Sequence, residues 1–443
     1  MRPNPVPTTR RLARFRRDES GGITPFSMLM LFVFMMIAGL ALDMTHHVKA
    51  QTQLQIAADT AAHAAIVSRR GNDAAAARAV ALDVLQGNMP SGRFGQVVTA
   101  EHIEFGRWED GEFRPDPDET SAVRVLGLRN ADRRNALRTY LLRTVGVDAI
   151  DVAALAVFET YQPICIEEGF VAEGKVDVQS NNTYLRGFCI HSNSFVRINQ
   201  NNFFEEGTIV SMPDLDLLQM PNSGFDRNEG LEAALRQGSL DIRVLRELDQ
   251  VIDGILNDSP EYRRAYVENP TPIIRNLSGQ NNRLDASDFE EGRIHDFRCS
   301  SGGQKISIPQ GTSLRRIVLV TNCVLDLGNN VSMEDVLIAS TSTATRAIDG
   351  GQGIRIGRED NCESGGGAQI ITKGGMRFPG NMGIFGSQLI ASGDINFAAR
   401  ADGVQGASMI AGGEIDGTSN SSMARCNRGM DDNIRAPYFR MVR

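Results

Sequence analysis

Six cysteines are the residues whose type and spacing could most directly do chemistry. They are Cys165, Cys189, Cys299, Cys323, Cys362 and Cys426. None forms a Cys-x-x-Cys motif or a cysteine–histidine cluster, so the pattern gives no support to a tetrahedral zinc site. In an exported chain an even number of cysteines predicts disulfides, and two equal separations favour Cys165 with Cys189 and Cys299 with Cys323. The alternative is that the cysteines are reduced and buried, as in a cytoplasmic protein. Which alternative holds depends on whether the N-terminus predicts export.

Charged clusters are the second source of candidate chemistry. In a polysaccharide lyase, clustered acids hold calcium and a nearby basic residue abstracts a proton. The residues that could play these parts are Asp214, Asp216, Arg355, Arg358, Glu359 and Asp360. Solvated surface charge is the simpler interpretation of both groups.

The remaining motifs are incomplete. The sequence Asp-Ala-Ser-Asp-Phe at 285–289 begins like the Asp-x-Ser-x-Ser metal site of a von Willebrand A domain but lacks the second serine. The glycine-rich stretches at 350–353 and 365–367 lack the Lys-Ser/Thr of a phosphate loop. A net charge of -8 argues against nucleic acid as a partner. We therefore expect no catalytic residue, no cofactor, no metal ion and no enzymatic activity.

The N-terminus predicts a membrane anchor. Five arginines between residues 10 and 17 precede an uncharged run that extends to Leu42, and the next charged residue is Asp43. From Ile23 to Leu42 the run has the roughly 20 residues that cross a bilayer as a helix. The arginines place the N-terminal side in the cytoplasm and the rest of the chain outside it. A cleaved signal peptide, ending near Ala38 to Ala41, is the alternative.

The helix is expected to continue past the anchor with a stripe of small residues. The stripe consists of Leu54, Ala57, Ala58, Ala61, Ala64 and Ala65, which recur at three- and four-residue steps. Small residues permit close helix approach, as pilin-like subunits need when they pack against neighbouring helices. Packing of the stripe on its own domain is the alternative interpretation.

These N-terminal features resemble TadG-like proteins of the TadE/TadG superfamily, which assemble Flp (Tad) pili. The resemblance rests on Asp-Glu-Ser-Gly-Gly-Ile-Thr at 18–24, on the apolar run with its following acid, and on Ile-Glu-Phe-Gly-Arg-Trp at 103–108 followed by Ser-Ala-Val-Arg-Val at 121–125. It covers roughly the first 160 residues. It implies a candidate prepilin-type processing site between Gly22 and Ile23. Related pilins carry Glu at the fifth position after the cut glycine, where this chain has Ser27, so a permanently anchored component is favoured.

The rest of the chain predicts two further domains. Residues 43–162 are expected to form a small pilin-like α+β domain with helices at 73–85 and 132–145 and strands at 97–108, 122–128 and 150–158. Leu137, Leu141 and Leu142 would share one face of the second helix. From 163 to 443 short apolar strands alternate with Asn- and Gly-rich corners.

An internal repeat gives the second domain its expected fold. The segments 367–376, 386–395 and 406–415 align, and 337–340 echoes their centre. A period of about 20 residues with one short apolar strand and glycine corners predicts a β-solenoid (β-helix), with a β-sandwich as the alternative. A helical insertion is expected at about 228–267. The predicted fold class is therefore α+β with an all-β repeat region behind an N-terminal transmembrane helix.

The predicted function is a non-enzymatic, single-pass inner-membrane component of a Tad pilus system that supports pilus biogenesis and surface adhesion. The resemblance implies other Tad membrane components and pilin-like subunits as partners, with the bulk of the chain periplasmic or extracellular. The alternative is an anchored β-helix module that binds cell-surface glycan, and a lyase is less favoured.

Overall fold

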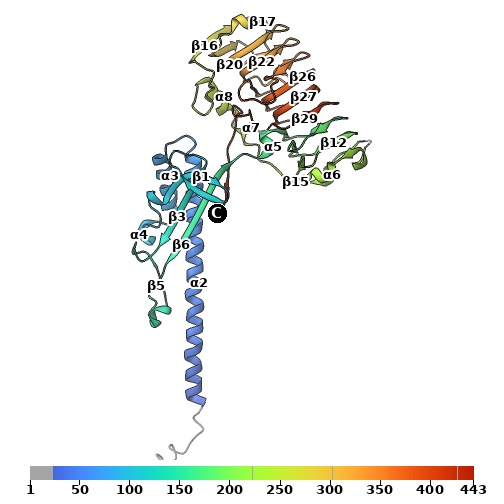
Figure 1. Cartoon of the computed structure of the whole chain (residues 1–443). Helices are drawn as coiled ribbons and strands as arrows, with labels where there is room; N and C mark the ends of the chain where they lie inside the picture. The colour runs from blue at the N-terminus through green and yellow to red at the C-terminus, as the bar shows by residue number, and fades with distance from the viewer. Residues whose placement is uncertain (1–22, 222, 302, 427) are drawn as a thin grey trace, which may run out of the picture. The chain divides into compact units, whose positions relative to one another are not determined.

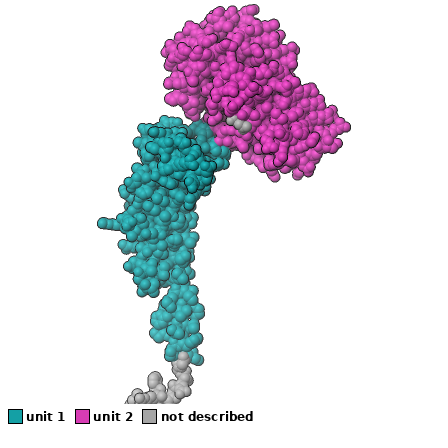
Figure 2. Space-filling view, in the orientation of Figure 1, with its two compact units in different colours: residues 1–161, 437–443 teal, residues 162–436 magenta. Residues whose placement is uncertain are grey.

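The computed structural model describes residues 23–443 except 222, 302 and 427, so the arginines and Gly22 lie outside the described residues. The chain divides into two compact units, coloured separately in Figure 2: residues 1–161 with 437–443, and residues 162–436. The sequence prediction assigned 437–443 to the second domain, whereas the structure assigns them to unit 1. The reason is that strand β30 (Tyr438–Met441) pairs antiparallel with the end of strand β6 (Val152–Tyr161). Unit 2 is therefore inserted between two neighbouring strands of unit 1.

Unit 1 contains helices on one antiparallel sheet. Its elements are α2 (Ile23–Ser68), α3 (Ala74–Asn88), α4 (Ser91–Phe94), η2 (Ala100–His102), β1 (Ile103–Glu109), β2 (Glu112–Pro115), β3 (Ala122–Arg129), β4 (Leu137–Arg138), η3 (Leu142–Val145), β5 (Ala149–Ile150), β6 and β30. The sheet order is β2-β1-β3-β6-β30, and α2 packs against β3, β6 and α3 (Figure 1). The expected helix at 73–85 and the three expected strands of this domain are all present.

The expected helix at 132–145 is wrong, because side-chain hydrogen bonds hold this segment as a loop and a short hairpin. The buried Asn135 amide donates to the carbonyls of Gln96 and Leu128, and its oxygen accepts from the N–H of Asn130. Arg134 has a φ of 56°, which interrupts a right-handed helix. Asparagine side chains compete with helical hydrogen bonds in this way.

Unit 2 is dominated by one sheet of 23 strands. Its elements are α5 (Ile164–Glu167), β7 (Gly169–Ala172), β8 (Val176–Val178), β9 (Thr183–Tyr184), β10 (Cys189–Ser192), β11 (Val196–Ile198), β12 (Asn202–Phe204), β13 (Ile209–Met212), η4 (Leu215–Leu217), η5 (Phe225–Arg227), β14 (Asn228–Glu229), α6 (Leu231–Ala234), β15 (Leu235–Gln237), α7 (Arg243–Arg246), α8 (Leu248–Leu256), β16 (Asn269–Leu277), β17 (Asn281–Arg283), η6 (Ala286–Asp288), β18 (Arg293–Cys299), β19 (Lys305–Ile308), β20 (Ser313–Thr321), β21 (Val324–Leu327), β22 (Ser332–Ser340), β23 (Ile348–Gly350), β24 (Arg355–Ile356), β25 (Ala368–Thr372), β26 (Met376–Ala391), β27 (Ile395–Ala411), β28 (Ile415–Asp416) and β29 (Ser422–Ala424).

The chain does not fill this sheet in sequence order. Parallel pairings connect β16-β18-β20-β22-β25-β26-β27-β7-β10-β13-β15 in one continuous row. The chain enters the row at β7, runs to β15, crosses to β16 and returns until β27 pairs with β7. The last repeat therefore pairs with the first, and Met409 of β27 lies opposite Phe170 of β7.

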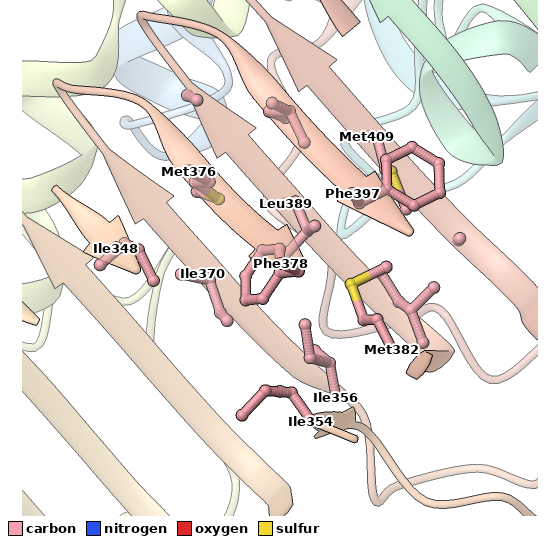
Figure 3. Close-up of a cluster of buried hydrophobic side chains, with 14 of the residues drawn as sticks. Ile348, Ile354, Ile356, Ile370, Met376, Phe378, Met382, Leu389, Phe397 and Met409 are labelled. Atoms are coloured by element: carbon pink, nitrogen blue, oxygen red, sulfur yellow. The ribbon is translucent and has the colours of Figure 1, made fainter. Parts of the chain in front are cut away.

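The core of unit 2 is built by equivalent positions of successive strands. Ile370, Leu389 and Met409 occupy one register and are fully buried, and Phe378 and Phe397 occupy another (Figure 3). The aligned segments of the sequence repeat correspond residue by residue to this register. Stacking gives each strand the apolar neighbours that it could not bury alone.

Buried asparagines order one corner of the repeats. Asn182, Asn202 and Asn228 are each at most 2% exposed. The side-chain oxygen of Asn202 accepts from the N–H of Asn182, and that of Asn228 accepts from the N–H of Asn202. This ladder satisfies backbone groups that the turning chain leaves without strand partners.

The helical insertion is shorter than expected. Residues 228–237 contain two strands of the sheet, because β14 and β15 pair with β12 and β13, and only the short α6 lies between them. The helices α7 and α8 follow, and α8 packs against β20 and β22 through Leu248, Ile252 and Ile255. The segment thus connects the two ends of the row while covering the outer face of its strands.

Candidate functional site

The apolar half of α2 is the first component of the candidate site. Among the described residues, α2 is the one helix long and apolar enough to cross a membrane. Its apolar side chains face outward from the chain, with Ile23 76% and Phe34 65% exposed. In Figure 1 this part of α2 extends beyond the sheet of unit 1. Bilayer lipid removes such a surface from water, as packing does for a soluble helix.

Asp43, the first acid after the apolar run, is held by a backbone clamp. The residue is 2% exposed. Its Oδ1 accepts from the N–H of Tyr140 at 2.5 Å, and its Oδ2 accepts from the N–H groups of Leu141 and Leu142 at 2.9 and 2.7 Å. A buried carboxylate is costly unless its lone pairs are satisfied, and three N–H donors supply that satisfaction. Asp43 therefore ties α2 to the loop between β4 and β5.

That loop, with its two short strands, forms a hairpin from Leu137 to Ile150. A side chain at Gly39 would lie 2.8 Å from the Cβ of Leu141, so glycine permits the close approach of hairpin and helix. The Tyr140 ring lies 4.7 Å from that of His46. The hairpin is thus fixed beside the last turn of the apolar run.

The small-residue stripe is buried inside unit 1. Leu54, Ala57, Ala58, Ala61 and Ala65 are at most 1% exposed, and Ala64 is half-buried. They pack in one cluster with side chains of the sheet and α3. The stripe therefore packs α2 onto its own domain, which was the alternative interpretation of the sequence.

All six cysteines form disulfides, and all three bonds lie within unit 2. The pairs are Cys165–Cys189, Cys299–Cys323 and Cys362–Cys426. The first two are those that the equal spacing favoured. Cys165–Cys189 ties α5 to β10, and Cys299–Cys323 joins successive repeats. Structural disulfides are typical of proteins outside the reducing cytoplasm.

The charged groups considered as lyase candidates are engaged in local structure. Asp214 accepts from the N–H of Asp216 at the start of η4. Arg358 pairs with Asp360 at 2.6 Å, and Glu359 pairs with Arg400. Within the described part of the chain, no group of three or more His, Cys, Asp or Glu side chains is placed to hold a metal ion.

His191 on β10 is a buried histidine of the sheet, 3% exposed. Its Nε2–H donates to Asn193 Oδ1, and its Nδ1 accepts from Ser211 Oγ at 2.7 Å. Burial lowers the pKa of His191, opposed by the hydrogen bond to Asn193 and the charge of Glu173. The ring is therefore a neutral, structural group.

Sequence reasoning missed the partner of Asp43. The acid itself was noted as the end of the apolar run, but its three donors lie about a hundred residues along the chain. The interrupted leucine pattern at 137–142 signalled only an amphipathic helix. A carboxylate directly after an apolar run is the one local signal that could have suggested a clamp.

Two family models match the chain. The model described as Putative Flp pilus-assembly TadE/G-like matches residues 21–82, which contain the apolar run, Asp43 and the alanine stripe. This match confirms the resemblance and places the anchor region in the TadE/G-like class. The model described as Domain of unknown function (DUF7867) matches residues 169–427, more than half of the chain. The chain belongs to the DUF7867 family. No curated protein and no solved structure matches it.

Proposed function

We propose that this chain is a non-enzymatic, membrane-anchored component of a Flp pilus assembly system that carries a β-solenoid outside the cytoplasm. The carrying observation is that one 46-residue helix has an exposed apolar half and a half buried in a folded domain. The TadE/G-like match covers both halves. Such a helix anchors a domain directly against the membrane, without a flexible linker.

The β-solenoid is supported by the pairing of successive repeats. Strands recur at offsets near 20 residues with parallel partners and a common interior. Because unit 2 is inserted between adjacent strands, both of its ends are attached to unit 1. We propose that it is displayed on the far side of the inner membrane and supports adhesion, with Tad membrane components and pilin-like subunits as partners of unit 1.

The disulfides support the proposed orientation. Three bonds in unit 2 fit an oxidising compartment, in agreement with the N-terminal arginines remaining in the cytoplasm. Residues 23–42 would span the inner membrane once.

The test is deletion of the gene in its own host, followed by quantification of sheared surface pili and of attachment. The full chain should restore both. Phe34→Arg places a charge in the exposed apolar run, where it should block anchoring and restoration. Val67→Arg is the matched control on the same helix, at a position 40% exposed beyond the anchor, and should restore both. Unchanged pili and attachment after deletion would overturn the proposal.

A further inference from the structure

The hairpin from Leu137 to Ile150 exposes a cluster of apolar side chains. Val145 is 66%, Tyr140 52%, Leu141 44% and Val147 42% exposed. These residues lie on one short, continuous segment. An exposed apolar cluster of this kind is typical of a surface that contacts a membrane or another protein.

The position of the hairpin along α2 favours the membrane as the contact. Leu141 contacts Gly39, which lies three residues before the end of the apolar run. At 1.5 Å of rise per residue, this contact is about 5 Å to the apolar side of Leu42. If Ile23 to Leu42 spans the hydrocarbon, Leu141 lies at the boundary between acyl chains and headgroups. The Asp43 clamp holds the hairpin at this level.

Basic side chains surround an open hollow beside the hairpin. Its basic lining consists of Lys49, Arg93, Arg129, Arg134, Arg138 and Arg143, and Asp148 is the one acid among the described residues that line it. The arginine ion pairs found among the described residues of unit 1 include those of Arg107, Arg114, Arg124 and Arg440. These four arginines do not line the hollow. An apolar tip next to a basic hollow is complementary to a leaflet with anionic phospholipid headgroups.

We propose that the hairpin is a second, interfacial membrane contact that docks on the leaflet where α2 leaves the bilayer. Leu141, Val145 and Val147 enter the acyl–headgroup boundary, and the basic hollow binds lipid phosphates. The inference rests on the proposed anchor, and it adds a contact that fixes the rotation of α2 and holds unit 1 against the membrane.

The test uses depth-dependent fluorescence quenching of the full chain in vesicles of phosphatidylcholine and phosphatidylglycerol. Trp108 is the single tryptophan, so Trp108→Phe gives a silent background. In that background Val147→Trp reports the hairpin, and Val80→Trp on α3 is the matched control, because these valines are 42% and 43% exposed. Phe34→Trp reports the anchor. The quenchers are phospholipids brominated near the headgroup or deep in the acyl chain.

We expect shallow brominated lipid to quench Val147→Trp strongly, deep brominated lipid to quench Phe34→Trp, and neither to quench Val80→Trp. Quenching of Phe34→Trp without quenching of Val147→Trp would overturn the inference and leave the anchor standing. Absence of quenching at both positions would overturn the anchor as well.

The basic hollow is tested in the same system. Quenching of Val147→Trp should weaken when phosphatidylglycerol is omitted, and Arg138→Gln with Arg143→Gln should remove that dependence. Quenching that is independent of anionic lipid would overturn the headgroup contact. Binding in which Val80→Trp is quenched equally would show non-specific adsorption and would also contradict the proposal.

Discussion

Unit 1 and unit 2 bury apolar surface in different ways. Unit 1 sets the alanines of α2 against an antiparallel sheet, where Ala57 and Ala61 allow close approach. Unit 2 stacks larger side chains such as Leu389 and Phe378 from parallel repeats, and it contains all three disulfides. Unit 1 therefore depends on one helix whose other half is an exposed apolar run, whereas unit 2 depends on contacts between its own repeats. The units should respond separately to mutation.

The largest expected effect is on unit 2. Cys362→Ser with Cys426→Ser removes a bond that closes a 64-residue separation and should cost about 4 kcal/mol by loop-closure entropy. Hydrogen–deuterium exchange of peptides from unit 2, followed through a urea series, should show a lower unfolding midpoint. Fluorescence of Trp108, which lies in unit 1, should not change. Removal of Cys299–Cys323, with a 24-residue separation, is the control and should cost about 3 kcal/mol. A coupled shift of both signals would contradict independent units.

The reciprocal change is in unit 1. Ala61 of α2 is fully buried in the hydrophobic core of unit 1. Ala61→Leu should therefore overpack that core and destabilise unit 1 by about 1–3 kcal/mol. Trp108 fluorescence should report this loss, while the hydrogen-exchange midpoint of unit 2 peptides should stay unchanged. Val67→Leu, at an exposed position of the same helix, should be neutral. A tolerated Ala61→Leu would show that the helix does not pack as described.

An effect of similar size tests the ladder of buried asparagines in unit 2. Asn202→Ala leaves the N–H of Asn182 without its acceptor and should cost about 1–3 kcal/mol. Asn201→Ala, at the neighbouring exposed position, would instead remove an outward hydrogen bond to Asn181. Because Asn201 has a φ of 61°, Asn201→Gly is the better-matched control and should be nearly neutral. Hydrogen exchange of unit 2 peptides through a urea series measures the stability of both variants. Equal losses would show that the buried ladder does not contribute to stability.

The sequence predicted the elements with local signals and missed those that depend on distant partners. The repeat at 367–415 gave the strand register correctly. Matching the identical letters of 337–340 and 389–392 would set Leu337 opposite Leu389, yet the structure pairs Ile338 with Ile370, and Ile370 with Leu389. A one-residue slip exchanges the faces of a strand, and sequence similarity alone does not resolve it.

Two further features could not be predicted from local sequence, because both depend on partners that are distant in the chain. They are the order of the strands in the sheet of unit 2 and the hairpin of unit 1. The pairing of β27 with β7 joins residues more than two hundred positions apart. A periodic sequence pattern does not indicate which repeats lie next to each other. The first two cysteine pairs were predictable because each joins residues only 24 positions apart in sequence. The apolar half of α2 was predictable because an uncharged run of about 20 residues can be counted in the sequence.

The smallest expected effect is pH dependence in unit 2. Because burial lowers the pKa of His191, the folded ring stays neutral while the unfolded ring takes up a proton as the pH falls below about 6.5. The unfolded state then binds more protons, so His191 removes stability as acidity increases. The unfolding midpoint of the wild type should therefore fall more between pH 7.5 and pH 5 than that of His191→Gln. Equal slopes would show that the ring titrates freely in the folded protein.

The most direct test of the account replaces residues 162–437 with a short Asn-Gly turn between Tyr161 and Tyr438, which are paired neighbours in the sheet. The shortened chain and the full chain are each returned to the deletion strain, and sheared pili and attachment are counted. The account predicts that both chains restore pili and that only the full chain restores attachment. A shortened chain that reaches the membrane fraction but restores no pili would contradict the assignment of assembly to unit 1.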